Sequence, residues 1–146
     1  MDYFSSMEIS ATGLAAEKLR LQAVALNLAN ANSTAAPGTA PYQALRVVSR
    51  PIGAGDFGRH WNEAGANLPA GVTTLGLQPE NAPPRRVYQP RHPDADAQGF
   101  VAHANVDPLT EMTTMMSAVR AYEANIKAIG AAKTMAQKAL EIGSTK

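Results

Sequence analysis

The chain has 146 residues, a formal charge of +1 at pH 7 and no cysteine. Because its 13 basic and 12 acidic residues nearly balance, it lacks the strongly basic character of nucleic-acid binders. The lack of cysteine excludes disulfides, thiolate metal sites and a cysteine nucleophile. No segment approaches the roughly 20 apolar residues of a membrane span, and the first residues lack the basic and apolar regions of a cleaved signal peptide. We therefore expect no nucleic-acid ligand, no membrane span and no cleaved secretion signal.

Proline and glycine divide the chain into three regions. Residues 1–32 contain no proline and one glycine, whereas residues 33–106 contain nine of the ten prolines. Residues 107–146 contain one proline, at their start, and two glycines. Since proline interrupts helices, this distribution predicts an N-terminal helix in 1–32, an extended or β-rich middle segment in 33–106 and a C-terminal helix in 107–146.

The first region has the apolar period of an amphipathic helix that starts near Ser5 or Ser6. The residues before Ser5 show no clear period, and we expect them to be disordered in the free chain. One side of the helix repeats every seven residues and is broadened by small or β-branched neighbours. This stripe consists of Met7, Leu14, Leu21 and Leu28, with Ala11, Val24 and Ala25 beside them.

The helix ends in an unusual cluster of asparagines, Asn27, Asn30 and Asn32. Asparagine is a poor residue for a helix interior because its amide competes with backbone partners. One interpretation is that Asn27 is a buried device that fixes helix register, with Asn125 on the other helix as a candidate partner. The alternative is simple termination, in which Asn30 or Asn32 takes the left-handed conformation of a C-terminal cap. Both interpretations can hold together.

The middle region contains short β-branched or aromatic runs bounded by proline or glycine. Residues 41–51, 84–90 and 99–106 are typical of edge strands or extended ribbons, and residues 71–77 can add one more strand. Between them, residues 52–84 hold glycine and proline too densely for a long helix. We expect a loop or hairpin there, with Phe57 and Trp61 packed locally.

The third region carries the strongest helical signal of the chain. Asp107 is suited to cap a helix whose first position is Pro108. Apolar residues then follow in alternating steps of three and four, interrupted only by Lys133, and alanines keep the flanks of the helix thin. The stripe consists of Met112, Met115, Val119, Tyr122, Ile126, Ile129, Lys133, Ala136 and Leu140.

These elements predict a mainly α fold with a β or extended insert, in which the N- and C-terminal helices pair as a coiled-coil-like hairpin. Such a hairpin covers only part of the two apolar faces, and exposed stripes of this size mark interaction sites. We therefore expect a subunit of an assembly whose terminal helices make the contacts. The predicted assembly residues are Met7, Leu14, Leu21, Val24, Asn27, Leu28, Asn30, Met112, Met115, Val119, Tyr122, Asn125, Ile126, Ile129 and Leu140.

Patterns that would indicate chemistry are weak. His92, Asp94 and Asp96 alternate and could present metal ligands, but a solvated turn whose aspartates accept bonds from nearby amides is the favoured reading. No nucleophile motif is present, and residues 53–58 resemble a phosphate loop without its lysine and helix. We expect no catalytic site, cofactor, metal or small-molecule substrate.

Two further clusters have ordinary explanations. Arg85, Arg86 and Arg91 form the only basic cluster, for which a solvated or acid-paired strand is more plausible than a nucleic-acid site. The methionines Met112, Met115 and Met116 could line a groove that accepts helices, although the heptad spacing favours packing in a helix bundle.

Two stretches resemble bacterial flagellar axial proteins. Residues 14–33 resemble the helix-end signature of that family, carried here by Asn27, Leu28, Ala29 and Asn30. Residues 88–125 closely resemble the proximal rod subunits of the flagellar basal body. The matching positions are His92-Pro93, Ala95-Asp96, Gly99, Asn105-Val106, Glu111-Met112 and Arg120-x-Tyr122. Ala104 departs from the family, which usually has proline there.

The resemblance implies a rod subunit whose terminal helices form an inner layer around an export channel, with the middle segment outside. It implies export through the flagellar type III apparatus without signal cleavage, and assembly in the periplasmic space. The implied partners are copies of the chain itself, other proximal rod proteins, the distal rod protein, and the membrane ring with its adapter. The rival hypothesis is a soluble helical-hairpin adaptor or export chaperone, which predicts strong amide protection along both helices in the isolated chain.

Overall fold

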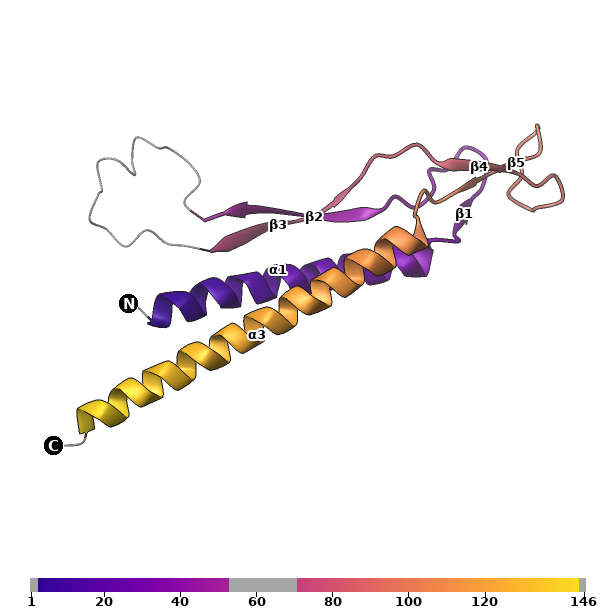
Figure 1. The fold of residues 1–146 in the computed structure, drawn as a ribbon. Helices are drawn as coiled ribbons and strands as arrows, with labels where there is room; N and C mark the ends of the chain where they lie inside the picture. The colour runs from indigo at the N-terminus through magenta and orange to yellow at the C-terminus, as the bar shows by residue number, and fades with distance from the viewer. Residues whose placement is uncertain (1–2, 53–70, 145–146) are drawn as a thin grey trace, which may run out of the picture. The chain divides into compact units, whose positions relative to one another are not determined.

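The computed structural model describes residues 3–52 and 71–144, and it is mainly helical with a β insert (Figure 1). Two long helices, one at each end of the chain, pack together, which confirms the predicted fold class. The elements in chain order are α1 (Tyr3–Asn30), β1 (Thr34–Ala35), β2 (Leu45–Pro51), β3 (Val72–Pro79), β4 (Arg85–Tyr88), β5 (Phe100–His103) and α3 (Pro108–Ser144).

The chain forms two compact units, each of which takes residues from both helices and from the middle segment. Unit 1 comprises Met1–Leu19, Val48–Gly76 and Ala118–Lys146, and unit 2 comprises Arg20–Val47 and Leu77–Ser117. The expected local packing of Phe57 and Trp61 lies outside the described residues, as does the loop at residues 53–58.

The ends of both helices follow from local hydrogen bonds. Helix α1 begins at Tyr3, ahead of the predicted start near Ser5 or Ser6. At its other end, the backbone N–H and the hydroxyl of Ser33 both donate to the carbonyl oxygen of Asn30, at 3.0 and 2.7 Å. Among the described non-glycine residues only Asn81 has a positive φ, so the left-handed cap predicted at Asn30 or Asn32 is wrong.

Helix α3 begins with the cap that the sequence predicts. The Asp107 carboxylate accepts bonds from the backbone N–H groups of Leu109 at 3.3 Å and Thr110 at 3.2 Å, and also from the Thr110 hydroxyl. These bonds favour the ionised carboxylate, the Thr110 hydroxyl most strongly, and they lower the pKa of Asp107. Pro108 occupies the first helical position, where its missing N–H costs nothing.

Unit 1 shows how closely its elements approach one another. A Cβ atom added at Gly13 of α1 would lie 3.0 Å from the Asn125 Nδ2 atom of α3, so a larger residue there would require the Asn125 side chain to shift. The Asn125 amide donates to the carbonyl oxygen of Ala121 in its own helix. Strand β3 meets α1 at Thr12, whose hydroxyl accepts a bond from the Val72 N–H at 3.1 Å.

Gly71 is the position in unit 1 where substitution should cost most. Its φ is +140°, and an added Cβ atom would lie 2.7 Å from Thr12 Oγ1. We expect Gly71→Ala to lower the free energy of unfolding by about 2–4 kcal/mol, because backbone strain and a steric clash add together. Gly76→Ala is the matched control: Gly76 also has a positive φ, of +119°, but an added Cβ atom there meets nothing within 4 Å.

The Gly71 prediction is tested by urea denaturation of the purified variants. The control should lose only the cost of backbone strain, about 1–2 kcal/mol. Equal losses for Gly71→Ala and Gly76→Ala would show that the contact with Thr12 contributes nothing.

Unit 2 contains a three-stranded antiparallel sheet in the order β1-β5-β4. Strand β5 is central, and its Val101 is fully buried. The buried core beside the helix ends is made of small residues against which Tyr42 packs. This core consists of Ala31, Ala44, Ala104 and Val106. The runs at 41–51, 71–77, 84–90 and 99–106 each contain a strand as predicted, whereas the short strand β1 was not anticipated.

Candidate assembly site

The most constrained polar group of unit 2 is the amide of Asn27, which is 0% exposed. Its Nδ2 atom donates to the carbonyl oxygen of Leu45 and to Oε2 of Glu111, both at 3.0 Å. Its Oδ1 atom accepts from the Leu45 N–H and from the Tyr42 hydroxyl, both at 2.8 Å. All four hydrogen-bonding positions of the amide are therefore used within the chain.

Glu111 extends the network from α3 toward the middle segment. Its side chain is only 1% exposed, and Oε1 accepts a bond from Arg46 Nη1 at 2.5 Å. The Nε atom of Arg46 donates to Glu80 Oε2 at 2.9 Å. Burial raises the pKa of the Tyr42 phenol, and the charge of Glu111 raises it further. Burial alone would lower the pKa of Arg46, but its bonds and charge contacts with Glu111 and Glu80 outweigh this and raise it.

This network, which we call the Asn27 network, consists of Asn27, Tyr42, Leu45, Arg46, Glu80 and Glu111. It joins α1, Tyr42 in the segment before β2, the first two residues of β2, the residue that follows β3 and the first turn of α3. Each of these contacts pairs a donor with an acceptor, so the network fixes the positions of α1, β2 and α3 relative to one another within unit 2. The Asn27 amide is fully occupied by groups of unit 2, so it does not bond to Asn125, the partner suggested from the sequence. A role of Asn27 in fixing the register of an assembly stays a prediction.

The predicted assembly residues differ widely in exposure. On α1, Val24 and Asn27 are buried, and the remainder are half-buried: Met7, Leu14, Leu21, Leu28 and Asn30. On α3, Met115, Tyr122, Asn125 and Ile129 are half-buried. The other four are exposed, namely Met112, Val119, Ile126 and Leu140. Val24 and Asn27 therefore contribute to the interior of the subunit, which corrects their expected place on an assembly surface.

Apart from Glu111, the buried positions of α3 are small residues rather than large apolar ones. Ala118 and Ala132 are buried, and both belong to unit 1. An alanine seam brings helices closer than methionine or isoleucine would allow, and it displaces those larger side chains to the flanks. Tyr42, Arg46 and Glu111 were not predicted as site residues. One signal was available for Glu111: it lies four and seven residues before Met115 and Ala118, on the same face of the helix, which indicates a buried carboxylate.

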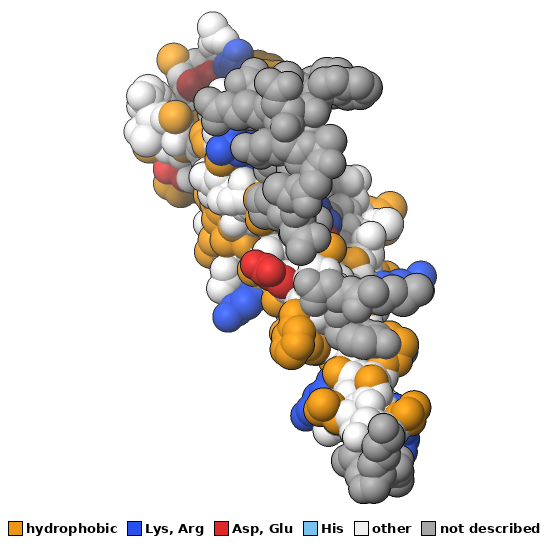
Figure 2. Space-filling view, turned by 90° about the vertical axis from the view of Figure 1, so that its left-hand side faces the viewer, with side chains coloured by type: hydrophobic (Ala, Val, Ile, Leu, Met, Phe, Trp, Pro, Cys, Tyr) orange, Lys and Arg blue, Asp and Glu red, His pale blue; other side chains and the backbone are white. Residues whose placement is uncertain are grey.

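Large hydrophobic side chains remain at the surface of the subunit. Figure 2 shows orange side chains reaching the surface at several places on one face. On α3 the exposed large hydrophobic residues are Leu109, Met112, Met116, Val119, Ile126, Met135, Leu140 and Ile142, and on α1 they are Phe4, Ile9 and Leu26. Exposed apolar side chains do not stabilise a monomer in water, and a surface of this kind is typical of a site that another subunit covers.

Asp96 is used in a local turn, whereas Asp94 binds a hydroxyl from a distant part of the chain. Asp96 Oδ1 accepts from the N–H groups of Gln98 and Phe100, both at 2.9 Å, and Oδ2 accepts from Arg86 at 2.5 Å. Asp94 Oδ2 accepts from the Thr34 hydroxyl at 2.7 Å. Within residues 3–52 and 71–144, no group of three or more His, Asp or Glu side chains is placed to hold a metal ion.

The turn at Asp96 should respond to acid. The Phe100 amide above all, and then the Gln98 amide and Arg86, lower the pKa of the Asp96 carboxyl, so its stabilising contribution is complete above the ordinary carboxyl pKa of about 3.9. That contribution is lost as the pH falls through the lowered value. We expect the Asp96 carboxyl to titrate below the ordinary aspartate range in an NMR titration, and Arg86→Ala to raise the Asp96 midpoint. A midpoint unchanged by Arg86→Ala would exclude a contribution from the ion pair.

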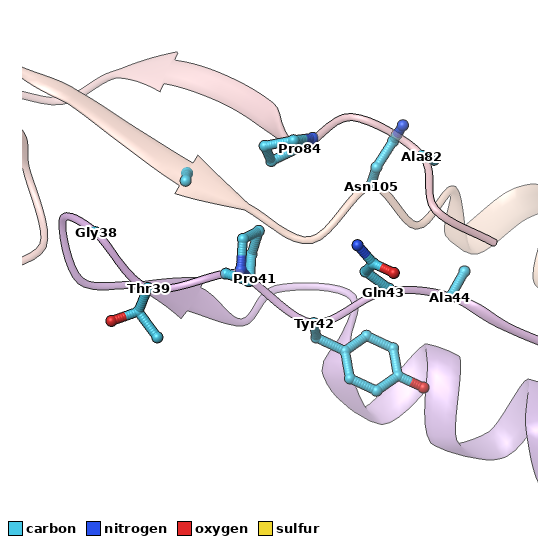
Figure 3. A pocket seen from close by; sticks show the side chains of 11 residues that line it. Gly38, Thr39, Pro41, Tyr42, Gln43, Ala44, Ala82, Pro84 and Asn105 are labelled. Carbon is cyan, nitrogen blue, oxygen red and sulfur yellow. The ribbon is translucent and has the colours of Figure 1, made fainter. Parts of the chain in front are cut away.

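The clearest cavity of unit 2 lies between residues 38–44 and the chain segments at 82–84 and 102–105 (Figure 3). Its volume is about 370 Å³, and its lining includes Tyr42, Gln43, Pro84 and Asn105. Among the described residues that line it, Tyr42 is the only ionisable one. In the described part of the chain, neither helix combines the length and hydropathy that a membrane span requires.

Comparisons with known proteins agree with the geometry. Residues 97–142 match the family described as flagellar basal body rod FlgEFG protein C-terminal. The flagellar basal-body rod protein FlgC of Bacillus subtilis is 37% identical over 150 residues, covering 98% of this chain and 99% of the relative. The FlgC proteins of Borreliella burgdorferi and Salmonella typhimurium are 34% and 36% identical, covering 97% and 98% of this chain and 98% and 99% of those relatives. The chain therefore belongs to the FlgC family and is a structural subunit of the flagellar basal-body rod.

Proposed function

We propose that the chain occupies the proximal part of the rod and that its copies assemble helically through α1 and α3 into a hollow, torque-transmitting shaft. The supporting observation is the set of large apolar side chains that α3 leaves exposed, among them Met112, Val119 and Ile126. Contacts between two different surfaces of identical subunits produce open helical assemblies. Under this proposal the terminal segments 1–32 and 107–146 form the assembly core, and the middle segment 33–106 makes the remaining contacts.

The proposed partners are those of a rod subunit. They are copies of the chain, other proximal rod proteins, the distal rod protein, the membrane ring with its adapter, and the flagellar type III export apparatus. The relatives named as rod proteins support this set, and they do not favour the soluble adaptor or chaperone. We place the subunit in the periplasmic part of the basal body, exported without a cleaved signal, and we assign it no catalytic role.

The test introduces charge into the exposed apolar surface without disturbing the fold. Val119→Lys and Ile126→Lys change exposed positions of α3, so the free energy of unfolding of the purified chain should change by no more than about 0.5 kcal/mol. In a strain that lacks its own gene for the subunit, both variants should fail to enter purified basal bodies and should abolish swimming. The matched control is Thr113→Lys, an exposed polar position of the same helix.

The outcomes distinguish assembly from folding. Wild-type stability with lost incorporation supports the proposal. Normal incorporation of Val119→Lys and Ile126→Lys would contradict an assembly role for these residues. Equal loss in Thr113→Lys would show that the effect does not depend on the apolar surface.

A further inference from the structure

Helix α3 carries three methionines within five residues, and two of them are exposed. Met112 and Met116 are 54% and 58% exposed, whereas Met115 between them is half-buried. Leu109, one turn earlier, is also exposed. The steps of three and four residues place these side chains on one flank of the helix, within unit 2. We call Leu109, Met112 and Met116 the methionine ridge.

The exposed thioethers are accessible to two-electron oxidants. A peroxide or a hypohalous acid transfers one oxygen atom to the thioether sulfur, which is oxidised by two electrons to the sulfoxide. The oxidant is reduced: hydrogen peroxide loses its O–O bond and leaves as water, and hypochlorous acid leaves as chloride and a proton. Because the chain has no cysteine, no thiol of its own competes for the oxidant.

Oxidation reverses the character of the methionine ridge. Methionine is apolar and adaptable, so it packs against irregular apolar partners, whereas its sulfoxide is polar and chiral. Burying a polar group without a hydrogen-bond partner is unfavourable enough to weaken association about tenfold or more for each group. Met115 is shielded within the subunit and should react more slowly.

We propose that Met112 and Met116 form an oxidation-sensitive site that blocks incorporation of the free subunit into the rod when both sulfur atoms carry oxygen. The inference rests on the proposed function, because it requires the methionine ridge to be buried against a neighbouring subunit. Subunits that are already incorporated are protected, since the same contact covers the sulfur atoms. Oxidants therefore modify this site in free subunits before assembly, and not in subunits that are already part of the rod.

The test uses two double variants in a strain that lacks its own gene for the subunit. Met112→Gln with Met116→Gln places polar side chains of similar length on the ridge, and we expect at least a tenfold loss of incorporation into basal bodies. Met112→Leu with Met116→Leu keeps the ridge apolar and removes the sulfur, so its incorporation without oxidant is the baseline against which the glutamine variant and the oxidant pulse are measured. Met135→Gln is the matched control, because Met135 lies on the same helix and is 51% exposed but lies outside the ridge.

A hypochlorite pulse during rod growth then tests the oxidation itself. Peptide mass spectrometry should find sulfoxides at residues 112 and 116 in unincorporated wild-type subunits and not in those recovered from rods. After the pulse, the leucine variant should form several-fold more new rods than the wild type. Equal rod formation by both, or sulfoxides found equally in incorporated and free subunits, would overturn the oxidation proposal.

The two proposals fail in different ways. If the glutamine variant incorporates normally while Ile126→Lys does not, the oxidation-sensitive site is wrong and the assembly role of α3 stands. If both incorporate normally, the proposed function is wrong as well.

Discussion

Asn27→Leu should lower the free energy of unfolding by about 3–5 kcal/mol, although leucine is the better helix former. The substitution removes the partner of the Leu45 N–H and C=O groups, of the Tyr42 hydroxyl and of one Glu111 oxygen. Each buried polar group left without a partner costs roughly 1–3 kcal/mol, and the four losses overlap because the groups can partly rearrange. Urea denaturation of the purified chain measures the effect.

The matched control is Asn30→Leu, the same change three residues later in the same helix. Among the described residues, the half-buried Asn30 donates its amide to the Leu26 carbonyl oxygen alone, in a bond that is exposed to solvent, so its loss should cost less than about 1 kcal/mol. In cells, Asn27→Leu should allow export and reduce motility, because the subunit enters the rod without its fixed register. Equal destabilisation by both substitutions would show that the Asn27 network contributes no more than general helix packing.

Arg46→Met should have the second large effect, about 3–5 kcal/mol, because it leaves the carboxylate of Glu111 buried without a counter-charge. The methionine preserves most of the apolar length of the arginine side chain, so the change isolates the charge. Arg46→Lys should recover part of the loss, since it keeps the charge but cannot reach Glu111 and Glu80 with two nitrogens in a fixed geometry.

Glu80→Gln is the matched control for the ion pair at the surface. Glu80 and Arg46 are 46% and 40% exposed, and a pair of this exposure contributes about 1 kcal/mol or less. A double-mutant cycle between Arg46→Met and Asn27→Leu should be less than additive, because both act through Glu111. Full additivity, or equal losses for Arg46→Met and Glu80→Gln, would contradict the central place of the Glu111 carboxylate in unit 2.

Local patterns predicted the elements of the fold well. The proline-free stretches at both ends correspond to α1 and α3, and Asp107 followed by Pro108 marks the start of α3 to the residue. The runs bounded by proline and glycine each contain a strand, because extended backbone is what such flanks permit. Strand β1 escaped prediction because it is two residues long, and its pairing depends on β5, far along the chain.

The internal contacts of the helices could not be predicted in the same way. The heptad stripe of α3 named Met112, Val119 and Ile126 as seam residues, yet these side chains are exposed while Ala118 and Ala132 are buried. Periodicity shows that a helix has an apolar side, but several rotations of an alanine-rich helix satisfy the same period. The rotation of α3 about its own axis is decided by which side lets the two helices pack most closely, and the side with small residues permits the closest packing.

The sequence by itself determined where the helices and every described strand except β1 lie, how α3 begins, and that a surplus of apolar surface exists, since each depends on residues near one another in the chain. Tertiary structure alone decided that Asn27 bonds to Glu111, 84 positions away, and that Arg46 and Tyr42 complete the same network. A buried amide can form hydrogen bonds with any donor and any acceptor of suitable geometry. Its partners are selected by the packing of the whole unit, which no local pattern encodes.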